Sequence, residues 1–141
     1  MSYVVDASVA AKWFFREPGQ EMAEQLLAID RPLYAPDLIV AEVTNVLWKR
    51  WRTASLSPDY ATGIVRTLPT LFEQLLPGGF LADAAWQWSH TLDHPAYDCF
   101  YLAVAQHLET CMVTVDARLL AAVKGTEAGP LVCHLRDVVT A

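Results

Sequence analysis

The chain has 141 residues, a length typical of one domain, and we expect a single domain over residues 1–141. Its 54% hydrophobic and 18% charged residues exclude intrinsic disorder, and no apolar run approaches the roughly 18 residues that a membrane span needs. The net charge of −6 argues against a basic nucleic-acid-binding surface, because phosphate contacts rely on Lys and Arg. With no signal peptide before the first charge at Asp6, the sequence predicts a soluble, cytoplasmic protein without a membrane partner.

The first half of the chain opens with S-Y-V-V-D, an apolar run that ends in Asp6 and is typical of a short buried strand. The clearest helical period follows Pro36, where apolar residues recur at steps of three and four, as at Val43 and Leu47. In chain order, we expect a strand at residues 2–6, helices at 7–15 and 18–30, an extended piece at 33–35 and a helix at 37–53.

The second half begins with Ser57 and Pro58, a helix cap followed by proline at the first helical position, and this helix should stop near Pro69. The segment after Pro95 is apolar almost all round, which indicates a buried helix. Gly125 is suited to end the helix before it. In chain order, we expect a helix at 58–69, a strand at 72–76, helices at 80–92 and 96–109, a strand at 111–115, a helix at 117–124 and a strand at 131–135.

Strands alternate with helices along the chain. This order predicts an α/β fold with a mostly parallel central sheet that helices cover on both faces. In such sheets, ligands bind beyond the carboxyl ends of the strands. Asp6 and Asp116 each end an expected strand, so both acids should stand at the edge where sites form.

Four acids stand among residues that favour the interior: Asp6, Glu42, Asp98 and Asp116. Buried carboxylates are costly unless they are paired, hydrogen-bonded or bound to metal, and no Lys or Arg lies within five positions of Asp98. Convergence on one cation would satisfy all four, and an all-oxygen ligand set suits Mg²⁺ or Mn²⁺ rather than zinc. Each acid taken singly has an ordinary alternative, because the aspartates could cap helices and Glu42 could face solvent.

Three further residues could support such a site. Asn45 and Lys49 follow Glu42 on the same helix face, where Asn45 could bind a carboxylate or a metal-bound water and Lys49 a phosphate. Ser8 could offer its hydroxyl to a phosphate or to a neighbouring carboxylate. The basic cluster at 49–52 could instead simply stand at a helix end, where cations are favoured. Ser8 could instead be part of a helix cap.

Four segments, in this order and at this spacing, resemble the PIN-domain ribonucleases and most closely the VapC-type toxins of toxin–antitoxin pairs. The segments are V-V-D-A-S-V-A-A-K-W-F, A-P-D-L-I-V-A-E-V-T-N-V-L-W, H-P-A-Y-D-C-F-Y-L-A-V-A and T-V-D-A-R-L-L. Each is weakly specific alone, but together they span residues 4–120. Pro69 is a departure, because it falls where the family usually runs a longer helix.

The resemblance implies a PIN-like three-layer α/β/α sandwich with Asp6, Glu42, Asp98 and Asp116 as its acidic quartet. It implies a metal-dependent endoribonuclease that hydrolyses RNA phosphodiester bonds with Mg²⁺ or Mn²⁺ and leaves 5′-phosphate and 3′-hydroxyl ends. Asp6, Asp98 and Asp116 would be the main metal ligands, and Glu42 would hold a water or a second ion. As a toxin, the protein would form a homodimer and bind a cognate antitoxin that covers the acidic site.

Three consecutive aromatic residues suggest where that antitoxin binds. Trp13, Phe14 and Phe15 would lie about 100° apart on a helix, so they cannot all face one core. We predict that Trp13 or Phe15 lines the partner groove. Trp86 also lies off the apolar stripe of its helix, although half-exposed aromatic residues are ordinary on protein surfaces.

Other functions remain to be weighed. Phosphatases that form an aspartyl-phosphate need a second acid two residues after the first, where this chain has Ser8. The six glycines form neither a dinucleotide-binding G-x-G-x-x-G nor a phosphate-binding P-loop. A housekeeping RNA-processing PIN nuclease and a non-catalytic PIN-like module that binds RNA or a partner remain as alternatives.

The cysteines and histidines predict no additional chemistry. Cys99, Cys111 and Cys133 are odd in number and lack C-x-x-C spacing, which favours reduced and mostly buried thiols over disulfides or a zinc site. His90 and His94 are four residues apart, a spacing that could bind a metal on a helix. The expected helix end at Pro95 favours solvent-exposed or capping roles for them instead.

Overall fold

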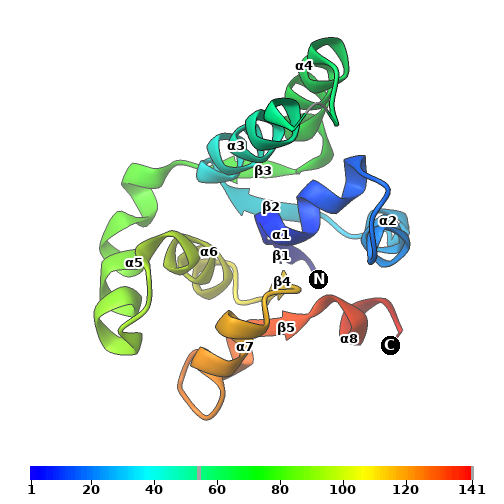
Figure 1. The fold of residues 1–141 in the computed structure, drawn as a ribbon. Coiled ribbons are helices and arrows are strands. Elements are labelled where there is room, and N and C mark those ends of the chain that lie inside the picture. The colour runs from blue at the N-terminus through cyan, green and yellow to red at the C-terminus, as the bar shows by residue number, and fades with distance from the viewer. Residues whose placement is uncertain (54, 141) are drawn as a thin grey trace.

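A computed structural model describes residues 1–53 and 55–140 and contains one five-stranded sheet (Figure 1). The strands are β1 (Tyr3–Val5), β2 (Leu33–Pro36), β3 (Gln74–Leu76), β4 (Met112–Thr114) and β5 (Val132–His134). Their order in the sheet is β3-β2-β1-β4-β5, and every pair is parallel. The α/β class and the parallel sheet are therefore confirmed.

Helices cover both faces of this sheet. They are α1 (Ala7–Ala10), α2 (Gln20–Ala28), α3 (Leu38–Arg52), α4 (Pro58–Thr67), α5 (Gly78–Leu92), α6 (Ala96–His107), α7 (Ala117–Val123) and α8 (Leu135–Val139). Helix α6 contacts β1, β2 and β4 and carries α5 on its outer side, whereas α1, α2 and α8 lie across the sheet (Figure 1). This arrangement is the expected α/β/α sandwich.

Local sequence explains most element boundaries. Ser57 caps α4 by accepting a hydrogen bond from the Tyr60 amide at 3.2 Å. Helix α4 ends at Thr67, and Pro69 lies in a 3₁₀ turn, Leu68–Leu71, as the proline predicted. Gly125, with a φ of +77°, follows the end of α7 in the left-handed conformation that glycine adopts at little cost.

Three elements differ from the sequence prediction. The helix expected at 7–15 divides into α1 and a 3₁₀ helix, Ala11–Phe14, and the third strand is shorter than 72–76. Helix α8 was missed because its five residues are too few to show a helical period. A third short 3₁₀ helix among the described residues, Gly129–Leu131, precedes β5.

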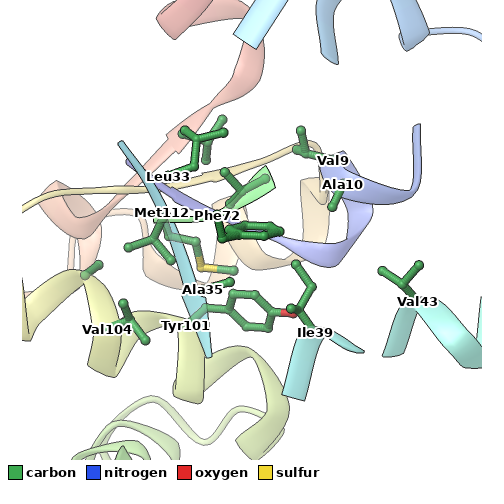
Figure 2. Close-up of a cluster of buried hydrophobic side chains, with 14 of the residues drawn as sticks. Val9, Ala10, Leu33, Ala35, Ile39, Val43, Phe72, Tyr101, Val104 and Met112 are labelled. Carbon is green, nitrogen blue, oxygen red and sulfur yellow. The ribbon is translucent and has the colours of Figure 1, made fainter. Parts of the chain in front are cut away.

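One part of the hydrophobic core lies between the sheet and α6 (Figure 2). Tyr101 of α6 lies beside Ala35 of β2 and Ile39 of α3, and all three are buried. The apolar character of α6 is therefore explained by its position, since one side faces the sheet and the other faces α5. Within the described residues, no helix has both the length and the hydropathy to cross a membrane.

The cysteines correct one expectation. Cys99 is buried as predicted, but Cys111 and Cys133 are only half-buried. Their Sγ atoms approach to 2.6 Å, because β4 and β5 are neighbours in the sheet. The sequence could not show this contact, since strand order brings the two residues together.

Candidate active site

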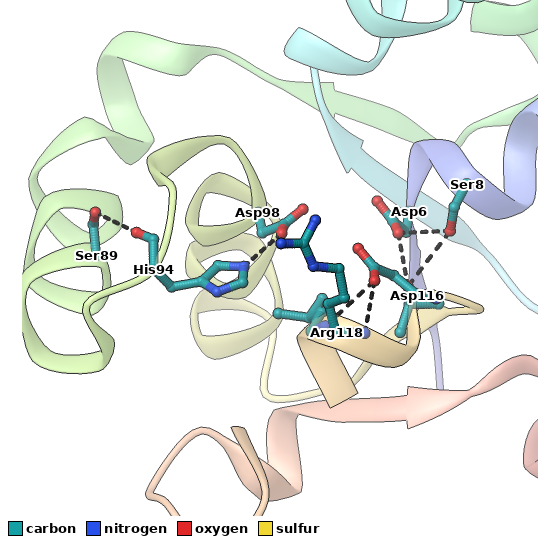
Figure 3. A network of polar contacts seen from close by, with 9 residues as sticks. Asp6, Ser8, Ser89, His94, Asp98, Asp116 and Arg118 are labelled. Atoms are coloured by element: carbon teal, nitrogen blue, oxygen red, sulfur yellow. Dashed lines mark hydrogen bonds and ion pairs between the residues drawn. The ribbon is translucent and has the colours of Figure 1, made fainter. Parts of the chain in front are cut away.

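Two of the four acids stand where β1 and β4 end. The Asp6 amide donates a hydrogen bond to the Val113 carbonyl at 3.0 Å, so neighbouring strands fix its backbone. Asp6 is 5% exposed, and its Oδ2 accepts hydrogen bonds from Ser8 Oγ and Thr114 Oγ1, each at 2.7 Å. Its side chain does not cap α1. Ser8 thus contacts a carboxylate, and the hydroxyls of Ser8 and Thr114 orient Asp6 from two sides (Figure 3).

Asp116 adopts the capping role that the sequence left open. Its Oδ1 accepts hydrogen bonds from the amides of Arg118 at 2.9 Å and Leu119 at 3.4 Å, at the start of α7. The Asp116 amide in turn donates to Thr114 Oγ1 at 3.0 Å. Thr114 therefore connects both strand-end acids. Sequence reasoning missed Thr114, although a threonine inside the apolar run V-T-V-D, two residues before an acid, was a usable signal. The structure buries this threonine fully.

The other two acids stand on helices. Glu42 of α3 accepts a hydrogen bond through Oε1 from the Tyr101 hydroxyl of α6 at 2.7 Å. Asp98 of α6 pairs through Oδ2 with His94 Nε2 at 2.6 Å (Figure 3). The prediction of a solvent-exposed or capping role for His94 is wrong, because its side chain is 13% exposed and contacts an acid. Tyr101 was not considered, although its spacing of three from Asp98 was available.

The four acids share one electrostatic environment. Burial raises the pKa of Asp6 above its ordinary value, the charges of Asp98 and Asp116 raise it further, and the two hydroxyl bonds oppose this shift. Burial likewise raises the pKa of Glu42, together with the charges of Asp6 and Asp98 and against the Tyr101 bond. Neighbouring negative charges that raise the pKa values of Asp6 and Glu42 form a site that a cation would relieve.

The donor atoms fit a hard divalent cation. Each acid uses one oxygen for its protein hydrogen bonds, which leaves a second oxygen without a donor among the described residues: Asp6 Oδ1, Glu42 Oε2, Asp98 Oδ1 and Asp116 Oδ2. No buried side-chain N or O atom in residues 1–53 and 55–140 lacks a partner, so Asp6 Oδ1 is open to solvent.

The free oxygens do not form a closed cage. In the part of the chain that the structure describes, no three His, Cys, Asp or Glu side chains are close enough together to hold one ion. Mg²⁺ commonly keeps several waters and binds through one or two carboxylates plus substrate phosphates. An open, all-oxygen site of this kind is compatible with that mode of binding.

The predicted supporting residues on α3 lie outside this hydrogen-bond network. Asn45 and Lys49 are both exposed, and neither is hydrogen-bonded to a site acid within the described chain. Arg50 of the basic cluster instead pairs with Glu17 and lies 3.9 Å from the centre of the Phe15 ring. Roles for Asn45 and Lys49 stay predictions.

The prediction that Trp13 or Phe15 lines a partner groove is wrong. Each is 7% exposed, and Trp13 Nε1 donates a hydrogen bond to the Ala23 carbonyl at 2.8 Å. The 100° spacing fails because the helix tightens to 3₁₀ at Ala11 and Phe15 leaves it in an extended conformation. Both side chains can therefore turn inward, and only Phe14 between them stays half-buried.

An apolar groove lies instead between α3 and α4, which stand side by side at the top of Figure 1. Trp48 and Trp51 are 48% and 52% exposed there, and Val65 faces them from α4. Leu47 and Ala61 complete the apolar lining. Trp51 continues the helical period of Val43 and Leu47, whereas Trp48 lies outside it, and the period alone did not reveal the exposure of Trp51.

Comparison with known proteins gives consistent results. A model of the PIN domain matches residues 3–125. The chain is 31% identical to Ribonuclease VapC3 of Pyrobaculum aerophilum over 84% of this chain and 92% of that protein. It is 32% identical to Ribonuclease VapC9 of Mycobacterium tuberculosis over 82% and 87%, respectively. The crystal structure of PAE2754 from Pyrobaculum aerophilum covers 99% of this chain and 88% of that one, with a TM-score of 0.73 and 21% identity, which supports the fold.

Proposed function

We propose the function of this chain from the premise that it belongs to the PIN-domain family and, within it, to the VapC-type ribonucleases. It is accordingly an endoribonuclease, a hydrolase of RNA phosphodiester bonds, and a toxin of a toxin–antitoxin pair. We propose that its activity depends on Mg²⁺ or Mn²⁺. The observation that carries this proposal is that four carboxylates at one sheet edge each keep one oxygen free of protein donors.

In the proposed mechanism, Asp6, Asp98 and Asp116 hold the metal ion directly or through water, and Glu42 holds a water or a second ion. The bound ion would supply a water of lowered pKa and a positive charge against the developing charge on the phosphate. Ser8 and Thr114 orient the Asp6 carboxylate through their hydrogen bonds to its Oδ2, which leaves Oδ1 to hold the ion when it is bound. No side chain is needed as a nucleophile, and the products carry 5′-phosphate and 3′-hydroxyl ends.

His94 and Tyr101 complete the carboxylate supports. His94 holds Oδ2 of Asp98, so that Oδ1 faces the site, and Tyr101 does the same for Glu42 through Oε1. Outer partners of metal ligands fix ligand orientation and basicity. The protein would therefore contribute a preset arrangement of acceptors rather than a reactive group of its own.

The antitoxin and a second toxin copy are the proposed protein partners. We assign the apolar groove between α3 and α4 to the antitoxin, in place of Trp13 and Phe15. Trp48 and Trp51 offer it a large exposed apolar area that a partner's apolar segment would bury. A homodimer and a cytoplasmic location, where RNA substrates occur, belong to the same proposal.

The whole chain is proposed to act as one PIN domain. The family model ends at residue 125, but β5 lies beyond it and pairs with β4 in the same sheet. The later residues therefore support the strand that leads to Asp116. The presence of all four acids favours catalysis over a non-catalytic RNA-binding module.

The test is cleavage of total cellular RNA by purified protein free of antitoxin. We expect discrete fragments with Mg²⁺ or Mn²⁺, and none with a chelator or with Asp98→Asn. Asp83→Asn is the matched control, because Asp83 is an exposed acid on α5 outside the site, and it should cleave like the wild type. Equal cleavage by Asp98→Asn, or cleavage that survives chelation, would contradict the proposal.

A further inference from the structure

A pocket lies at the end of α5, next to Asp98, and the proposed mechanism does not use it. Its lining residues are Trp86, Ser89, His90, Asp93, His94 and Pro95. Trp86 is 60% exposed, and its indole lies 5.7 Å from the His90 ring, centre to centre, at an angle of 40°. The pocket therefore presents a wide aromatic surface that nothing in the described chain covers.

The pocket is rigidly joined to the site. Ser89 Oγ donates to the His94 carbonyl at 2.7 Å, and the His94 amide donates back to the Ser89 carbonyl at 3.2 Å. These two bonds close the turn at Asp93, which has a φ of +49°. His94 then contacts Asp98, so a ligand in the pocket would be held beside a proposed metal ligand (Figure 3).

The chemistry of the pocket differs from that of the α3–α4 groove. The groove is lined mainly by Leu47, Val65 and two tryptophans, which suits an apolar protein segment. The pocket combines an exposed indole with imidazole, hydroxyl and carboxylate groups. A flat, polar-edged ring fits these groups, because its face can stack on Trp86 while its edge meets polar neighbours.

We propose that this pocket is a nucleobase subsite, in which an unpaired RNA base next to the cleaved phosphate stacks on Trp86. The inference rests on the proposed ribonuclease function and extends it, since a base can stack there only when it is free of a duplex. The substrate would therefore present an unpaired base at this position of the strand. Aromatic stacking of unpaired bases is a common means of binding such strands.

Arg118 supports the same path for the RNA. In Figure 3 its side chain extends from α7 into the space between Asp98 and Asp116. It is exposed, and it forms no ion pair with any described residue. A guanidinium in this place would bind a backbone phosphate. The strand would then run from Trp86 past Asp98 to Arg118.

In the experiment, a pool of short, randomised single-stranded RNA is cleaved in the presence of Mg²⁺, with the RNA below its saturating concentration. The cut ends are then sequenced. Trp86→Ala should lower kcat/KM about 5- to 150-fold, mainly through KM, and flatten the base preference at one position flanking the cut. Trp86→Phe, which keeps a ring, should recover most of both. The flattened preference distinguishes a base contact from a structural effect.

Phe80→Ala is the matched control. Phe80 is 58% exposed on the same helix and also lies against a histidine, His107, at 4.9 Å between ring centres. His107 ends α6, whereas Asp98 lies in its first turn, so this pair stands away from the acids. Phe80→Ala should keep wild-type kcat/KM and base preference.

Three outcomes would overturn the subsite: unchanged kinetics and base preference in Trp86→Ala, an equal loss in Phe80→Ala, or an effect of Trp86→Ala on dimerisation or antitoxin capture alone. These outcomes all presuppose that the wild type cleaves RNA with metal. If the wild type itself fails to cleave total RNA, the proposed function fails first, and the two failures are thus distinguishable.

Discussion

Asp6 and Asp116 stand at strand ends, whereas Glu42 and Asp98 stand on helices, and the two pairs are held differently. At the strand edge the donors are hydroxyls and backbone amides within the sheet and the turns that leave it, such as Thr114 Oγ1 at 2.7 Å from Asp6. On the helices each acid depends on a single side chain of the segment 94–101.

The acids differ in how firmly burial and hydrogen bonds fix their orientation. Asp6 is 5% exposed and accepts two hydroxyl bonds, one from the fully buried Thr114, which water cannot replace, and one from the half-buried Ser8. Glu42 and Asp98 are half-buried, so water can take over a lost bond. Asp116 is half-buried as well, so we expect Asp6 to be the rigid member of the site and the two helix acids its adaptable members.

The largest effect is expected from Asp6→Asn. Loss of an outer partner alone costs about 10- to 100-fold in metal affinity or activity, and loss of a central ligand should cost at least about 100-fold in cleavage rate. Ser8 and Thr114 can still donate to the amide oxygen, and a destabilising buried charge is removed. We therefore expect the Tm measured in chelator at neutral pH to rise, not fall. A cleavage rate near that of the wild type would remove Asp6 from the mechanism.

The strand half of the site was the more predictable half. Asp6 and Asp116 follow apolar runs, and parallel strands bring their carboxyl ends to one edge, so sequence order alone places them together. Glu42 and Asp98 were noticeable as acids in apolar segments. The bond from Tyr101 to Glu42 depends on how α3 and α6 are placed in space, which sequence spacing does not give, whereas His94 and Asp98 are four residues apart, and their pairing depends on the turn at Asp93.

The fold shows the same division between local and spatial information. Strand and helix order, the Ser57 cap and the stop near Pro69 follow from local rules, and the structure agrees. Trp13 and Phe15 were misplaced because the outcome depended on a change from α to 3₁₀ geometry at Ala11. No propensity in A-A-K-W-F-F specifies that change, so tertiary packing decides it.

A second prediction compares the supports of the two halves. Thr114→Val removes a donor to Asp6 at a fully buried position, so we expect a loss of about 1–3 kcal/mol in stability and about 10- to 100-fold in apparent Mg²⁺ affinity. Tyr101→Phe should lose less affinity, because water can reach Glu42. Mg²⁺ titrations of RNA cleavage measure both. Thr70→Val, at an exposed threonine, is the control. A larger loss of affinity in Tyr101→Phe would reverse the comparison.

The smallest expected effect concerns pH. The pKa values of Asp6 and Glu42 are raised in the folded chain by burial and neighbouring carboxylates, so folded protein binds protons more readily than unfolded protein between the ordinary and the raised pKa values. In that window, stability without metal should increase as pH falls, since ∂ΔG/∂pH is negative when the native state holds more protons. Asp6→Asn removes the larger burial effect, and the difference between wild-type and variant melting curves in chelator reports Asp6 together with the part of the Glu42 shift that the Asp6 charge causes. We expect the wild-type Tm to rise relative to that of the variant as pH falls from neutrality toward the ordinary pKa of an aspartate. A constant difference would mean that Asp6 is no more costly to ionise than a surface acid, and that burial does not set Asp6 apart from the other three acids.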